Sequence, residues 1–196
     1  MSFRHRASIV GFAALVLLAS TAFSSGAFSS ATLEREATVS VTTDDSALIA
    51  LIDGHPGSGL IEQTSGGTIE IDFTRGGAAG ATAGVRFQFG STSTPTTDHG
   101  FRIVNQGPSP HDLTVGFSLS GSDGGDPAGN VVFRLYHDVG TDGSIESQTT
   151  VSEETAAATI ASVAPGDTVY VVVTVDATDL GAGDDLSGDL SITAGS

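Results

Sequence analysis

Short segments of alternating apolar and polar residues, separated by glycine-rich turns, most constrain how this chain can fold. Successive side chains of a strand point to opposite faces of a sheet, so this alternation predicts half-buried strands. Turn residues such as Gly76-Gly77, Asp142-Gly143 and Pro165-Gly166 punctuate the pattern. The alternation predicts strands at residues 36–41, 68–73, 85–89, 101–105, 112–120, 131–137, 168–176 and 189–193.

This spacing of short strands predicts an all-β fold, an antiparallel jelly-roll-like β-sandwich. One segment departs from it: residues 46–52 follow Asp44-Asp45, either of which can cap a first helical turn, and we expect one short helix there. Residues 28–196 are expected to form a single domain. A domain of this length buries about 70% of the surface that its unfolded chain exposes. It needs no disulfide, and the chain has no cysteine.

The N-terminus has the order of a secretory signal. Residues 1–6 carry two arginines, residues 7–23 are apolar, and residues 24–31 are small apart from Phe28. We therefore predict a signal peptide at residues 1–27, with cleavage after Ala27 or, alternatively, after Ala22. Two other outcomes stay open: an uncleaved apolar anchor helix, or cleavage before the apolar run as in archaeal pilins. The signal predicts an extracellular or cell-surface protein that meets a membrane only through this segment, if it is uncleaved.

The charge balance indicates the environment in which the protein works and excludes one class of partner. The formal net charge is −16, with 23 acidic residues against seven basic ones, and every basic residue is an arginine. Salt screens such self-repulsion, with a Debye length of about 3 Å at 1 M, so the composition indicates a halophile. Nucleic acid is excluded as a partner because its binding needs clustered Lys or Arg.

An acidic turn is the best candidate for a metal site. Asp138, Asp142 and Glu146 surround Gly143 in a weak match to a calcium loop, with Gly140 and Thr149 where further ligands belong. The alternative is a plain hairpin turn between the strand ending at residue 137 and one starting near residue 144. Ca²⁺ is the one cofactor that the sequence suggests. No His-Glu-x-x-His or complete Gly-x-Ser-x-Gly motif is present, so we expect no enzyme.

The segment after the signal is the best candidate for assembly. Leu33, Ala37, Val39 and Val41 alternate with polar residues. They are interpreted either as the first strand of the sandwich or as a strand donated to the sheet of a neighbouring copy. A donated strand makes a head-to-tail contact, which propagates as a filament.

The junction Ser25-Gly26-Ala27-Phe28-Ser29-Ser30, the alternating strand that follows it, and residues 44–51 carry a resemblance. They resemble secreted haloarchaeal proteins of an uncharacterised family, similar in layout to the camelysin/TasA group of matrix-fibre proteins and to archaeal bundling pilins. The resemblance implies a β-sandwich and donor-strand polymerisation. Camelysin has been described as a metallopeptidase, but no matching ligand motif is present here.

These observations predict a secreted or cell-surface structural protein of a halophile. It would be a fibre, pilus or matrix subunit that associates with itself into filaments through its N-terminal strand. The first alternative is a monomeric surface binding module. The second is a metallopeptidase of the camelysin kind.

Overall fold

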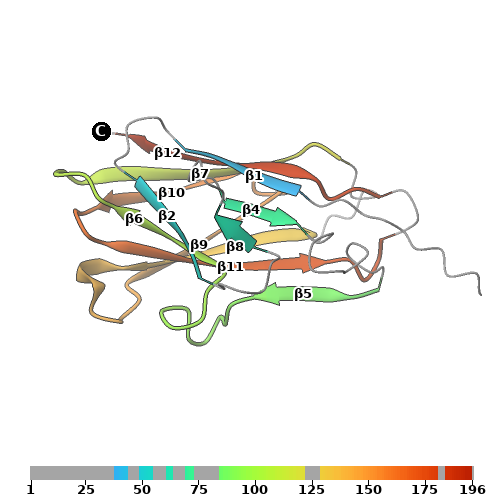
Figure 1. Cartoon of the computed structure of the whole chain (residues 1–196), viewed down its shortest axis with the longest axis horizontal. Coiled ribbons are helices and arrows are strands. Elements are labelled where there is room, and N and C mark those ends of the chain that lie inside the picture. Colours follow the sequence, from blue (N-terminus) through green and yellow to red (C-terminus); the bar gives the residue numbers. More distant parts are fainter. Residues whose placement is uncertain are drawn as a thin grey trace, which may run out of the picture. The chain divides into compact units, whose positions relative to one another are not determined.

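Strands dominate the computed structural model, which describes residues 38–43, 49–54, 61–63, 69–72, 84–121, 129–180 and 184–195 (Figure 1). The strands of these residues are β1 (Thr38–Thr43), β2 (Ile49–Asp53), β3 (Ile61–Gln63), β4 (Ile69–Asp72), β5 (Arg86–Phe89), β6 (Phe101–Asn105), β7 (His111–Leu119), β8 (Val131–Asp138), β9 (Ser147–Ser152), β10 (Ala157–Val163), β11 (Thr168–Asp176) and β12 (Gly188–Gly195). A single 3-10 turn, Val139–Thr141, is the helical element among them.

The strands form two sheets. The β1 sheet is six-stranded, in the order β10-β7-β12-β1-β4-β3. The β11 sheet has the order β2-β6-β11-β8-β9, and β5 pairs with β11 beyond the end of β6. Pairing among the described strands is antiparallel apart from β1 with β12, which lie side by side in parallel (Figure 1).

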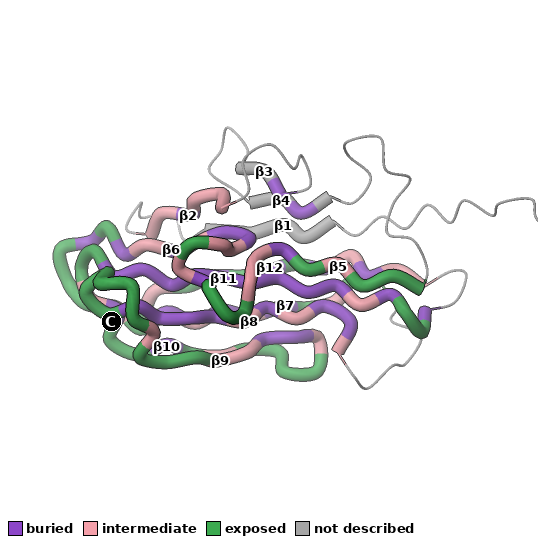
Figure 2. Tube along the Cα trace, turned by 90° about the horizontal axis from the view of Figure 1, so that it is seen from below, coloured by how far each residue is buried: buried purple, intermediate pink, exposed green. Residues whose placement is uncertain are grey.

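One apolar core joins the two sheets. In β7 every second residue is buried, and Leu113, Val115 and Phe117 face inward. Phe117 meets Phe133 of the β11 sheet with ring centroids 5.2 Å apart. Figure 2 shows the buried stretches along β7, β8 and β11. The inward faces of the two sheets therefore pack on each other, because each sheet has an apolar face to remove from water.

The central strand β11 is buried on both faces. Residues 168–175 are all buried, so its inward valines and its outward Tyr170, Val172 and Thr174 alike are hidden from water. On the outward side, the His99 ring lies 4.9 Å from the Tyr170 ring. The loop between β5 and β6 thus covers part of the outer face of the β11 sheet.

The eight predicted strands are each confirmed by a strand at that place, with ends shifted by a few residues. The antiparallel all-β prediction is confirmed for the described pairs except β1 with β12. The signal or apolar helix predicted at residues 1–27 lies outside the described residues, within which no helix is long and apolar enough to cross a membrane.

The short helix predicted at residues 46–52 is wrong. Ile49–Asp53 form β2, which pairs antiparallel with β6, and residues 46–48 lie outside the described part. Leu51 is buried in the core opposite Ile103. A helix this short has little stability of its own. Pairing with β6, by contrast, gives the backbone of β2 hydrogen-bond partners along one edge, and strands favour β-branched residues such as isoleucine.

Besides β2, the strands β3 and β10 were not predicted, and β9 was foreseen only as the second arm of the alternative hairpin after residue 137. In β10, Ile160 and Val163 are both buried although they are three residues apart. A register shift lies between them, and Ser162 has a positive φ of 54°. This bulge breaks the two-residue period on which the prediction rests.

Candidate functional site

The acidic turn between β8 and β9 carries the three carboxylates singled out in the sequence. Asp138 ends β8 and is fully buried. Its Oδ1 accepts a hydrogen bond from the Asp142 backbone N–H at 3.0 Å, and its Oδ2 accepts one from the Gly143 N–H at 3.1 Å. Asp138 therefore closes the turn on its own backbone.

The other two carboxylates also accept backbone hydrogen bonds. Asp142 Oδ1 accepts one from Ser144 N–H at 2.9 Å, and Glu146 Oε2 accepts one from Val139 N–H at 2.7 Å. Within the described ranges, no group of three or more His, Asp or Glu side chains is arranged to hold a metal ion. The geometry matches the hairpin-turn interpretation, since β8 and β9 pair antiparallel and the pair nearest the turn is His137 with Ser147. Calcium binding by this turn stays a prediction.

A buried histidine and aspartate tie the same turn to the start of β11. His137 Nε2 lies 3.3 Å from Asp167 Oδ2, with side-chain exposures of 6% and 4%. Asp167 also accepts backbone hydrogen bonds, from Gly140 N–H at 2.8 Å and from Ala164 N–H at 3.0 Å. Burial by itself raises the pKa of Asp167, but these two hydrogen bonds and the neighbouring His137 together lower it.

The sequence did not single out this pair. Asp167 was visible only as part of the Pro165-Gly166-Asp167 turn, and thirty residues separate it from His137. Only the pairing of β8 with β11, in which Val169 lies opposite His137, brings the two side chains together.

The candidate assembly strand lies inside the sheet of its own chain. Leu33 and Ala37 are outside the described residues, whereas Val39 and Val41 belong to β1. In the parallel register Val39 lies opposite Gly188 and Val41 opposite Leu190 of β12. On its other edge β1 pairs antiparallel with β4. The backbone of β1 thus bridges the β10-β7-β12 block and the β4-β3 pair.

No protein-family model, no curated protein and no solved structure matches this chain.

Proposed function

We propose that this chain is an exported structural protein that polymerises by exchanging β1 between copies. The position of β1 in the sheet carries the proposal. Because β1 separates β12 from β4, its departure would divide the sheet into a three-strand block and a two-strand block. The same slot in a neighbouring copy would receive an identical strand with identical pairing.

An exchange of β1 between copies costs little free energy, because the backbone pairs lost in one copy form again in the next. The register gives β1 five residue pairs with β12 and three with β4. All of them form again when β1 of one copy fills the slot of the next. Empty edges at β12 and β4 would present unpaired N–H and C=O groups, which favour the addition of a strand. Since donor and acceptor are different surfaces, the contact repeats head to tail and builds an open filament.

The composition supports a location outside the cell in high salt. The predicted signal precedes β1, and the lysine-free chain carries a net charge of −16. At molar salt the repulsion between neighbouring subunits is screened within about 3 Å, so acidic copies can approach closely. We include in this proposal a jelly-roll-like connection of the two sheets.

Electron microscopy of the purified chain in molar salt is the first test, and we expect filaments with a regular axial repeat. A cysteine pair then distinguishes exchange from stacking, because the natural chain has no cysteine. Ser40 lies opposite Glu70 in the β1–β4 register. Oxidised Ser40→Cys/Glu70→Cys filaments should run as a covalent ladder on a non-reducing gel.

The matched control uses a pair whose strands stay in one chain. Ser118 and Asp189 are exposed register partners in β7 and β12. Oxidised Ser118→Cys/Asp189→Cys filaments should run as monomers. Filaments whose Ser40–Glu70 cross-link stays within single chains would contradict strand exchange while leaving a structural role. Stable monomers at high protein and salt concentrations would contradict both and favour the surface binding module.

A further inference from the structure

The outer face of the β11 sheet carries a polar hollow that the assembly proposal does not use. It has a volume of about 320 Å³ and is lined by Arg86, Gln88, Thr92, Arg134, Tyr136 and Gln148. β5, β8 and β9 supply five of these residues, and the loop between β5 and β6 supplies Thr92. No acidic residue is among them.

The arginines of the described residues gather on the outer face of the β11 sheet. The described residues contain three arginines, Arg86, Arg102 and Arg134, and all lie on the outer face of the β11 sheet. Arg134 and Arg102 occupy outward positions of β8 and β6, since their neighbours along each strand are buried in the core. Asp176 lies beside Arg86 on this face, but in a chain of net charge −16 the lining of the hollow itself contains two arginines and no acid. A ligand held here is therefore expected to be an anion.

Arg134 is the better anchor of the two arginines in the hollow. It is half-buried, and its Nη1 donates a hydrogen bond to Thr174 Oγ1 at 3.1 Å. Among the described residues no carboxylate lies within 4.0 Å of its guanidinium. A guanidinium has five N–H donors, so donors are left for a ligand. Arg86, by contrast, has its Nε 3.8 Å from Asp176 Oδ2.

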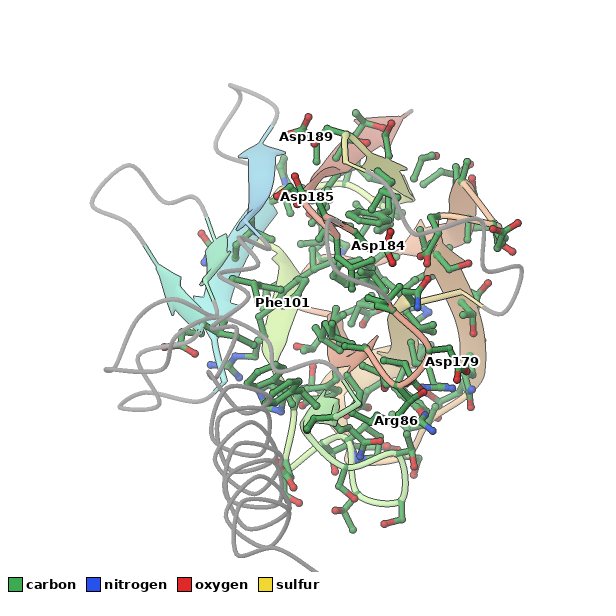
Figure 3. All side chains as sticks on the ribbon, turned by 90° about the vertical axis from the view of Figure 1, so that its right-hand side faces the viewer. Arg86, Phe101, Asp179, Asp184, Asp185 and Asp189 are labelled. Atoms are coloured by element: carbon green, nitrogen blue, oxygen red, sulfur yellow. The ribbon has the colours of Figure 1, made fainter. Side chains whose placement is uncertain are left out.

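The carboxylates near these arginines belong to a neighbouring hollow. Arg86 and Arg134 also line a cavity of about 190 Å³ together with Asp176 and Asp179. Figure 3 shows Arg86 and Asp179 on the same side of the molecule, with Asp184, Asp185 and Asp189 farther up in the view. The acid-free hollow on the Gln88 and Gln148 side is thus the one suited to an anion.

The hollow is held in shape by a structured loop and a buried floor. Ser91 N–H donates to the Asp98 carbonyl at 2.9 Å, which closes the loop that carries Thr92. Tyr136, which lines the hollow, is buried; it lies opposite Tyr170 of β11, on which the His99 ring packs. Such preorganisation reduces the entropy lost on binding.

We propose that this polar hollow binds a hydroxyl-rich carboxylate with the chemistry of a uronic acid. A guanidinium pairs with a carboxylate through two parallel hydrogen bonds, a geometry that lysine lacks. The amides of Gln88 and Gln148 and the hydroxyl of Thr92 suit sugar hydroxyls, because each both donates and accepts. The Gln88 amide Nε2 also donates to the Gly90 carbonyl at 2.9 Å, which holds this side chain beside the hollow. The volume is at the lower end for small-molecule sites, which begin at about 300 Å³.

The test is isothermal titration calorimetry of the purified full chain at constant ionic strength. Sodium glucuronate, glucose and sodium sulfate are titrated in separate experiments. We expect saturable glucuronate binding, and binding of glucose and sulfate that is at least about tenfold weaker. Arg134→Gln should weaken glucuronate binding at least about tenfold. Arg102→Gln, the same substitution on the same face outside the lining, should leave it unchanged. Circular dichroism checks that each variant is folded.

A second variant tests the sugar part of the proposal. Gln148 is exposed on β9, an edge strand, so Gln148→Ala removes an amide without opening the core. It should weaken glucuronate binding and leave any sulfate binding unchanged. Sulfate that binds as tightly as glucuronate would reduce the hollow to a general anion site and overturn the proposal. No binding, or only a self-association abolished by Arg134→Gln, would overturn it too. None of these outcomes depends on the exchange of β1.

Discussion

Gly188, the first residue of β12, is the place where one added methyl group tests the core most directly. A Cβ at Gly188 would lie 2.5 Å from Phe117 Cζ and 2.7 Å from the Ser118 carbonyl oxygen. Phe117 has little room to withdraw, because it is 2% exposed and its ring centroid lies 5.2 Å from that of Phe133. Overpacking of this kind costs about 1–3 kcal/mol, which we expect for Gly188→Ala.

Urea unfolding followed by circular dichroism measures this loss. With a slope near 2 kcal/mol per molar urea, a loss of 2 kcal/mol lowers the midpoint by about 1 M. Gly195→Ala is the matched control in the same strand, because its nearest contact would be the Asp112 carbonyl oxygen at an ordinary 3.7 Å. We expect its midpoint to be unchanged or slightly higher, since alanine restricts the unfolded chain more than glycine does.

A smaller side chain at residue 117 should relieve the clash with an alanine at residue 188, so the effects of the two substitutions should not be additive. In a double-mutant cycle with Phe117→Leu, the double variant should lose less stability than the two single variants together, by about 0.5–3 kcal/mol. Additive losses, or a Gly188→Ala variant as stable as Gly195→Ala, would refute the argument that Phe117 occupies this space.

Three further variants test the rest of the fold. Phe133→Ala should lower the free energy of unfolding by about 3–5 kcal/mol in the same urea assay, because Phe133 is fully buried between the sheets. Gly140→Ala should cost about 1–2 kcal/mol although nothing lies within 4 Å of its added Cβ, because Gly140 has a φ of 75°; an unchanged midpoint would contradict this. The lowered pKa of Asp167 stabilises the fold above its unfolded pKa of about 3.9, and this contribution is lost as the pH falls through the folded pKa. Asp167→Asn should therefore be less stable at neutral pH and show a flatter acid limb in pH-dependent unfolding, and a limb as steep as that of the natural chain would contradict this role.

Alternation predicted those strands in which every second residue enters the core. In β7 and β12 the inward residues keep this period over the whole strand, so the pattern was visible without any knowledge of the partners. In β10 the bulge between Ile160 and Val163 breaks the period, and in β2 a short apolar run is equally compatible with a helix. Both strands form because a neighbouring backbone, β7 or β6, is in place to pair with them.

The candidate sites likewise divide into one that local spacing predicted and others that only strand pairing brings together. Asp138, Asp142 and Glu146 lie close in the sequence, so their place in one turn followed from local spacing. Asp167 joins that turn only through the pairing of β8 with β11. The polar hollow had no local signal, because Arg86, Arg134 and Gln148 come from three separate strands.

The amino-acid sequence by itself determined the β-rich class and the acidic, lysine-free surface, because alternation and charge are local properties of the chain. Tertiary structure decided which strands are neighbours, including the parallel pairing of β1 with β12 between ends of the chain far apart in sequence. It also decided that Arg86 and Arg134 share one face. Such long-range pairings depend on the simultaneous packing of two sheets around one core, which no single segment encodes.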